Sequence, residues 1–173
     1  HPDTPFGLGA PRWDQLDMVV NAAAERGMGI LGVLNSTPVW ATNRTPINGQ
    51  PTDVTRFADF ARSVALRYGD KISAYEVWNE PNSAQFWNPL DPVAYTEMLK
   101  VTYTALKDAS AQIGSEITVV GGVVGAGLTW GNATMNPIDF VQRMYDAGAD
   151  GYFDALFSLR TQTDDEVRAA LSP

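Results

Sequence analysis

The sequence AYEVWNEPNSAQFWN, at residues 74–88, joins a short apolar segment to a strongly polar one. Residues 74–78 are predicted to form a buried strand, and Asn79-Glu80-Pro81-Asn82 follows it directly. Asn and Pro favour turns, so a surface turn is one interpretation of this boundary. The buried strand before it, with Trp78 and Trp87 around it, favours a functional site instead. The rest of the sequence has to distinguish these two interpretations.

Short apolar segments alternate with helical patterns along the whole chain. The predicted strands cover residues 29–34, 74–78, 117–124 and 153–159. The predicted helices cover residues 13–26, 53–69, 91–113 and 136–148, and a last short helix begins at the capping box of residues 163–166. The strands lack polar alternation, which is typical of a parallel sheet buried on both faces. The sequence therefore predicts an α/β fold with about four parallel strands.

Two architectures fit this alternation: a doubly wound open sheet, and part of an eight-fold β/α barrel. A nucleotide-binding sheet normally carries Gly-x-Gly-x-x-Gly after a strand. The glycines at positions 121, 122 and 125 have a different spacing, and no phosphate-loop lysine follows them. A nucleotide-binding function therefore has little support.

The bulk composition excludes several classes of function. The 173 residues suit one domain, and the net charge of −8 argues against a nucleic-acid partner. No apolar run approaches the roughly 20 residues of a membrane span. The chain contains no cysteine, and His1 is its only histidine, which argues against thiolate chemistry, a histidine triad and a zinc site. We expect no cofactor or metal, so acid–base chemistry must depend on carboxylates.

The polar and aromatic residues gather after the predicted strands, where parallel α/β folds bind ligands. They are Asn35 and Trp40 after the first strand, Asn79, Glu80 and Trp87 after the second, and Trp130 after the third. Flat aromatic faces beside amides and a carboxylate suit a sugar ring, because the rings stack on its C–H faces and the polar groups bind its hydroxyls. The sequence thus predicts a carbohydrate site.

The octapeptide YEVWNEPN, at residues 75–82, resembles the Asn-Glu-Pro signature that ends the fourth barrel strand in a clan of retaining (β/α)8 glycoside hydrolases. That clan includes cellulase family 5 and the xylosidase-like family 39. Residues 37–41, TPVWA, look like the segment after the third strand of family 39, and residues 13–17, WDQLD, look like the helix before it. The resemblance implies that residues 1–173 form one incomplete catalytic domain, a partial TIM barrel from about helix 2 to helix 6.

The resemblance also implies roles for the candidate residues. Glu80 would be the general acid/base, and Asn79 would bind the sugar hydroxyl next to the anomeric carbon. Trp40 and Trp87 would stack on sugars, with loop packing as the alternative, and Asn35 would join them in binding substrate.

Two further residues are given structural roles. Glu76 has the same strand parity as Glu80 and is expected inside the barrel, paired or hydrogen-bonded. Trp130 is expected to pack within its own loop.

A retaining reaction needs a second carboxylate about 5 Å from the first. In this clan it is a Glu at the end of strand seven, and the chain is expected to lack that strand. We therefore expect a retaining glycosidase of polysaccharides or glycoconjugates with impaired activity, or a non-catalytic carbohydrate-binding remnant. Exposed sheet edges predict self-association. A secreted or cell-envelope bacterial location is expected, although no signal peptide is seen in this chain.

Overall fold

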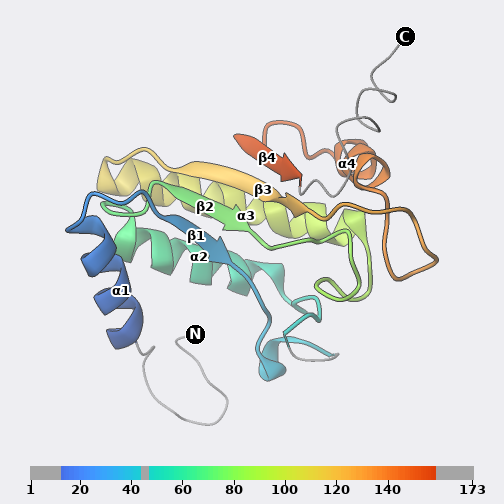
Figure 1. Cartoon of the computed structure of the whole chain (residues 1–173), viewed down its shortest axis with the longest axis horizontal. Helices are drawn as coiled ribbons and strands as arrows, with labels where there is room; N and C mark the ends of the chain where they lie inside the picture. Colours follow the sequence, from blue (N-terminus) through green and yellow to red (C-terminus); the bar gives the residue numbers. More distant parts are fainter. Residues whose placement is uncertain (1–12, 44–46, 159–173) are drawn as a thin grey trace.

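The computed structural model describes residues 13–43 and 47–158, and its strands and helices alternate as predicted (Figure 1). The helices are α1 (Asp14–Ala24), α2 (Val54–Tyr68), α3 (Pro92–Ile113) and α4 (Pro137–Asp146), with a short 3-10 helix η1 (Val39–Ala41). The strands are β1 (Leu31–Leu34), β2 (Ala74–Val77), β3 (Thr118–Val124) and β4 (Ala155–Ser158). Each of these four α-helices and four strands lies within its predicted range. The short helix predicted at 163–166 lies outside the described residues.

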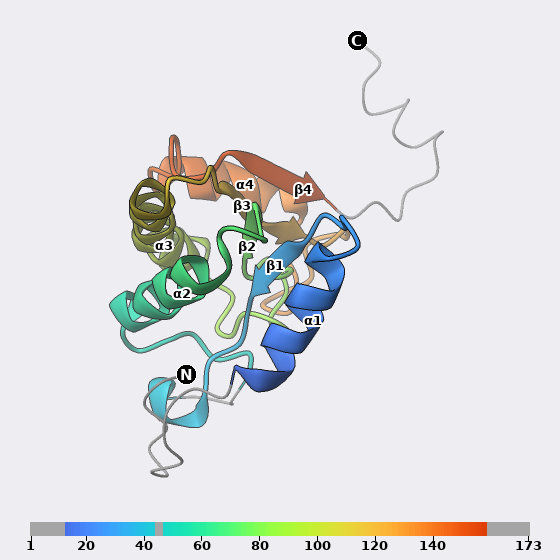
Figure 2. The same ribbon diagram turned by 90° about the vertical axis from the view of Figure 1, so that its left-hand side faces the viewer.

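The four strands form one parallel sheet in the order β1-β2-β3-β4. The strand order follows the chain order, and crossovers between parallel strands are right-handed, so successive helices fall on the same side of the sheet. Figure 2 shows α2 and α3 together against one side of a curved sheet. This arrangement fits part of a barrel, because a doubly wound sheet needs a reversal of strand order with helices on both faces.

The helix-covered side of the sheet holds the core. Gly32, Tyr75 and Val119 share that side, since they are partners in the parallel registers. Tyr75 and Val119 are fully buried. A Cβ built on Gly32 would lie 2.8 Å from Cδ1 of Tyr75, so the glycine makes room for the aromatic ring. The glycine of β1 thus lies opposite the bulky tyrosine of β2.

The prediction that every strand is buried on both faces is wrong for the two edge strands. Leu31 and Val33 of β1 are 43% and 49% exposed, and Phe157 of β4 is 50% exposed. These strands have a neighbour on one side only in the described structure, so their side chains opposite the helices are left partly open to solvent. The central strands β2 and β3 are largely buried.

The helix ends are where the caps predict them. The side chains of Asp53, Asp91 and Asn136 accept hydrogen bonds of 2.9–3.1 Å from backbone N–H groups in the first turns of α2, α3 and α4. Gly114 ends α3 in the left-handed conformation, with φ 68°. Among the described residues, no helix is both long and apolar enough to cross a membrane.

Candidate active site at the carboxyl end of β2

The backbone turns sharply where β2 ends. Strand β2 stops at Val77, and the next residues include two with positive φ, Trp78 at 68° and Glu80 at 46°. Residues other than glycine adopt a positive φ at a penalty of about 1–3 kcal/mol each. Such residues cluster at functional sites. The strand parity that relates Glu76 to Glu80 in the sequence therefore does not extend past Val77. Glu80 is positioned by other contacts.

Backbone hydrogen bonds to β3 position Glu80. Its N–H donates to the carbonyl of Val123 over 2.8 Å, and Asn79 pairs with Val123 as an isolated parallel bridge. The Glu80 carbonyl in turn accepts from the N–H of Ser83 over 3.0 Å. The strand pairing between β3 and β4 is irregular between Val120 and Val123. This bulge-like irregularity lies in the segment of β3 that contacts Asn79 and Glu80.

The Glu80 side chain lies over the end of β3. A Cβ built on Gly125 would lie 3.1 Å from both Cδ and Oε2 of Glu80. Gly125 is buried, whereas Glu80 and Asn79 are half-buried. A glycine thus lets the carboxyl group approach the backbone closely while part of Glu80 stays accessible to a ligand.

The Asn82 side chain joins the loop after β2 to the segment after β3 by hydrogen bonds. Its amide nitrogen donates to the carbonyls of Gly125 and Met135 over 2.8 and 2.9 Å. Its amide oxygen accepts from the N–H of Gly125 over 2.7 Å. The side chain is only 3% exposed, and its polar atoms are well satisfied. Asn82 is therefore a structural residue that fixes the loop carrying Glu80.

Tyr95 supports the same region from α3. Its hydroxyl oxygen lies 2.7 Å from the carbonyl of Val77 and 2.8 Å from that of Gly121, where it can donate. Complete burial raises the pKa of Tyr95 well above its usual value, so the hydroxyl keeps its proton. Gly122 has φ 81°, and a Cβ there would lie 2.6 Å from the Tyr95 hydroxyl. The close approach of Tyr95 to β3 thus requires a glycine.

Glu76 is buried on β2, as the sequence predicts. It is 3% exposed, and its Oε1 accepts from the N–H of Val123 over 3.3 Å. Burial raises the pKa of Glu76, and the Val123 hydrogen bond opposes this rise. Val123 thus contacts Glu76 through its N–H and Glu80 through its carbonyl.

The predicted sugar-stacking role of Trp87 is wrong for this structure. Its side chain is 0% exposed and packs edge-on against Trp78, 5.1 Å between ring centroids, and against Tyr95, 5.7 Å away. Its indole N–H donates to the carbonyl of Asp91 over 3.1 Å. Trp87 belongs to an aromatic core behind the loop. It is one of the residues that line the groove between α2 and α3, but its 0% exposure leaves no ring face open for sugar stacking.

The prediction for Trp130 is also wrong, in the opposite direction. Its side chain is 78% exposed, so it does not pack within its loop. An exposed tryptophan was missed because sequence alone does not distinguish a buried ring from an exposed one. The pairing of its loop with the loop of Glu80 would have indicated the exposure of Trp130. That pairing is a tertiary contact, which the sequence does not reveal.

Asn35 and Trp40 lie on the loop after β1, next to the end of β2. The N–H of Trp78 donates to the carbonyl of Leu34 over 2.9 Å, so the two loops start side by side. Asn35 is exposed, and Trp40 is half-buried within η1, with the guanidinium carbon of Arg56 6.0 Å from its ring centroid. Their contact with substrate stays a prediction.

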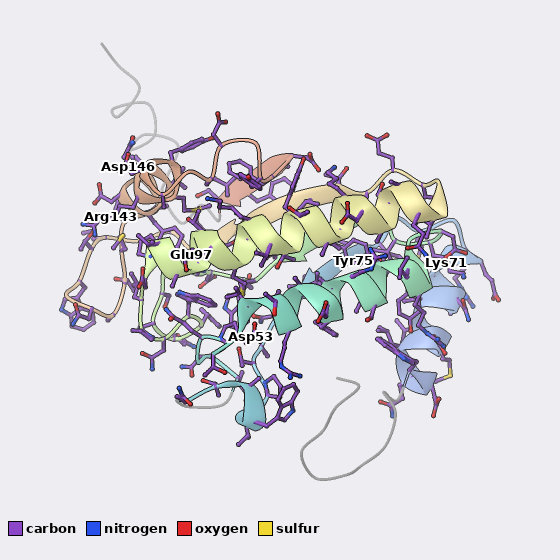
Figure 3. All side chains as sticks on the ribbon, turned by 180° about the vertical axis from the view of Figure 1, so that it is seen from behind. Asp53, Lys71, Tyr75, Glu97, Arg143 and Asp146 are labelled. Carbon is purple, nitrogen blue, oxygen red and sulfur yellow. The ribbon has the colours of Figure 1, made fainter. Side chains whose placement is uncertain are left out.

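Polar groups also line a groove near the helix starts. A groove of about 330 Å³ opens between α2 and α3, and Asp53 and Glu97 are among its lining residues. Figure 3 shows Asp53 at the start of α2 and Glu97 on α3. Asp53 is used as a helix cap, with its pKa lowered mainly by the hydrogen bonds from Thr55. Within residues 13–43 and 47–158, no cluster of His, Asp or Glu could hold a metal ion.

The comparison with known families identifies the family of the chain. The family model described as cellulase, glycosyl hydrolase family 5, matches residues 3–147, which include the whole Asn79–Glu80 region. The chain belongs to this family. The predicted resemblance to the Asn-Glu-Pro glycoside hydrolases is thereby confirmed.

Solved structures similar to this family 5 chain are glycoside hydrolases with (β/α)8 barrels. A monomeric beta-xylosidase from Caulobacter crescentus CB15 is 20% identical with a TM-score of 0.53, over 89% of this chain and 42% of that one. Xylanase B from Clostridium stercorarium F9 is 23% identical with a TM-score of 0.53, over 87% and 49%. The catalytic domain of an Ignisphaera aggregans GH53 protein is 19% identical with a TM-score of 0.53, over 84% and 41%.

These similarities confirm the predicted fold. The four parallel strands with their helices correspond to part of a TIM barrel, and the chain spans less than half the length of these three structures. The α/β fold and the partial-barrel architecture are thus both established, and the doubly wound alternative is excluded.

Proposed function

We propose that this chain carries the acid/base half of a retaining glycoside hydrolase site that acts on a polysaccharide or glycoconjugate. The observation that carries the proposal is the placement of Glu80 at the carboxyl end of β2, with its N–H bonded to Val123 and its carboxyl group over Gly125. Barrel enzymes use this end of the strands for catalysis. A strained, half-buried carboxylate in a rigid loop suits proton transfer better than a surface turn does.

In this proposal Glu80 acts twice. As an acid it donates its carboxyl proton to the glycosidic oxygen while a second carboxylate forms a bond to the anomeric carbon and the leaving group departs. As a base it then takes a proton from the water that displaces the second carboxylate. Asn79, half-buried beside it, binds the hydroxyl next to the anomeric carbon.

The second carboxylate does not come from the chain segments that follow β1, β2 and β3. Among the chain segments that follow β1, β2 and β3, residues 35–43, 78–88 and 125–135, Glu80 is the one carboxylate. Glu76 is buried and already accepts the Val123 N–H. We therefore propose that residues 1–173 by themselves hydrolyse glycosides poorly.

The same observation favours one second candidate, a non-catalytic carbohydrate-binding unit. Such a unit would keep Asn79, Trp40 and Asn35 for sugar contacts and would lack the nucleophile. A mechanism-based glycosidase inactivator tests for a nucleophile within residues 1–173, because it must form a covalent bond with one. Labelling of the chain, read by intact mass, would exclude the non-catalytic candidate and would also contradict the proposed lack of a nucleophile in this chain. Without labelling, residual hydrolysis that Glu80→Gln removes separates the two candidates.

The test of carbohydrate binding is NMR mapping on the ¹⁵N-labelled chain with xylobiose and cellobiose. The amide signals of Asn79 and Glu80 should shift with added sugar, while those of the helix-side control Leu106 should stay in place. Unchanged Asn79 and Glu80 signals at high millimolar sugar would overturn the proposed function.

The test of the acid/base role is hydrolysis of aryl β-glycosides by the chain and by Glu80→Gln, with Glu97→Gln on the exposed side of α3 as the control. Any turnover should fall by about 10²–10⁴-fold in Glu80→Gln for poor leaving groups. The turnover of dinitrophenyl glycosides should fall much less, because dinitrophenolate departs without a proton. Robust turnover of the unaltered chain would contradict the proposed impairment and leave the role of Glu80 intact.

We further propose that the two edge strands make the chain associate with itself. The half-exposed apolar side chains of Leu31, Val33 and Phe157 lie on these strands, and unpaired strand edges favour association. Light scattering between 10 and 500 µM should show a mass that rises with concentration. A constant monomer mass would contradict this proposal.

A further inference from the structure

The loop between β3 and α4 holds a tryptophan far out in solvent. Trp130 is 78% exposed, and its neighbour Leu128 is 79% exposed. The loop extends past the carboxyl end of β3 (Figure 1). Large apolar side chains that gather on a surface commonly mark a binding site.

The segment that bears Trp130 is a tight hairpin. The N–H of Trp130 donates to the carbonyl of Thr134 over 3.0 Å, and the N–H of Ala133 donates back to the carbonyl of Trp130 over 3.0 Å. The Thr134 hydroxyl also donates to the carbonyl of Leu128 over 2.8 Å. The backbone that carries the indole ring is thus fixed by hydrogen bonds on both sides, so this segment needs little backbone ordering when a ligand arrives.

The hairpin is also bonded to the loop that carries Glu80. The N–H of Ala84 donates to the carbonyl of Ala133 over 2.8 Å, and Ser83 and Thr134 form an antiparallel bridge. The N–H of Met135 donates to the carbonyl of Asn82 over 2.9 Å. Trp130 and Glu80 therefore belong to one hydrogen-bonded unit at the same end of the sheet.

We propose that Trp130 is a stacking platform for a sugar unit beyond the two that flank the cleaved bond. The site would then prefer oligosaccharides to disaccharides. This inference rests on the proposed function, because it places an outer binding position next to the Glu80 site. The flat indole face matches the C–H face of a pyranose ring, and the continuity with the Glu80 loop favours a carbohydrate over a second protein chain.

A competing occupant is a second copy of this chain. Ile138, at the start of α4, is 78% exposed, so it could join Leu128 and Trp130 in an apolar contact between copies. The experiment below includes this outcome.

The test uses the ¹⁵N-labelled chain, with the Trp130 indole N–H assigned from the Trp130→Ala spectrum. Xylohexaose and cellohexaose should shift this signal, and xylobiose and cellobiose should leave it in place. Trp130→Ala should bind the preferred hexasaccharide roughly tenfold more weakly by calorimetry, with disaccharide binding unchanged. Met18→Ala, at an apolar side chain of α1 that is 67% exposed, is the control and should bind both as the unaltered chain does.

Three outcomes would overturn the inference. If sugars shift Asn79 and Glu80 and leave Trp130 unaffected, the proposed function stands and the outer position is wrong. If no signal in either region shifts, both proposals fail. If the Trp130 signal changes with protein concentration and not with sugar, the tryptophan contacts a second copy.

Discussion

Glu80 and Val123 are joined by a backbone hydrogen bond of 2.8 Å that connects the loop after β2 to the irregular part of β3. The same Val123 donates its own N–H to the buried Glu76. The position of the candidate acid/base therefore depends on the shape of β3, which in turn depends on contacts from Glu76 and Tyr95. Changes far from any sugar should disturb this site.

Gly122→Ala should destabilise the chain strongly. Gly122 has φ 81°, and an added Cβ would lie 2.6 Å from the Tyr95 hydroxyl, so the variant suffers both backbone strain and overpacking. We expect the free energy of unfolding in urea to fall by about 3 kcal/mol. Gly114→Ala is the matched control, because Gly114 has φ 68° and open space around it. It should lose about 1 kcal/mol, and equal losses in the two variants would show that Tyr95 does not constrain β3.

Asn82→Asp should separate the Glu80 loop from the chain after β3. The Asn82 amide donates to the carbonyls of Gly125 and Met135, and a carboxylate would place oxygen against oxygen at both. We expect a loss of about 3 kcal/mol in the free energy of unfolding, since two buried acceptors lose their donor. Asn132→Asp, at an exposed position, should change it by less than about 0.5 kcal/mol. Retained stability in Asn82→Asp would mean that the loop is held by its backbone alone.

Glu76→Gln should alter the pH dependence of stability. Burial raises the pKa of Glu76 in the folded chain above its ordinary 4.5, so the folded state binds the proton more tightly than the unfolded state does. The stability from Glu76 is then fully present below pH 4.5 and lost as the pH rises through the folded pKa. Glutamine does not titrate and can still accept the Val123 N–H.

Urea unfolding of both proteins at pH 4 and pH 8 checks this expectation. The free energy of unfolding of Glu76→Gln, relative to that of the unaltered chain, should be higher at pH 8 than at pH 4. A difference that is the same at both would show that Glu76 ionises in the folded chain as easily as in the unfolded one.

Asp17→Asn should have the opposite pH signature. Hydrogen bonds from Arg67 (2.8 Å) and Tyr68 (2.6 Å) lower the pKa of Asp17 to about 2, with the Arg67 bond the larger cause. A lowered folded pKa gives stability that is present above the ordinary 3.8 and lost as the pH falls towards 2. Thermal unfolding between pH 6 and pH 2 should therefore decline less steeply for Asp17→Asn than for the unaltered chain. Parallel curves would mean that the α1–α2 ion pair does not contribute.

Much of this architecture follows from local sequence. Apolar runs separated by helical patterns predict the four parallel strands, and Asp53, Asp91 and Asn136 mark the helix starts because a cap is recognised within three residues. The placement of Glu80 at the end of β2 follows from the same local logic, since the Asn-Glu-Pro segment directly follows an apolar strand. These features depend on neighbours along the chain.

The tertiary structure alone decided how the tryptophans are used. Trp87 is buried because it packs against Trp78 and against Tyr95 of α3, whereas Trp130 lies on a hairpin that pairs with residues 82–84 and is 78% exposed. The contact between Glu80 and Val123 likewise joins residues 43 positions apart (123 − 80). Burial and hydrogen bonding of this kind depend on which elements pack together, and a local pattern of residue types does not contain that information.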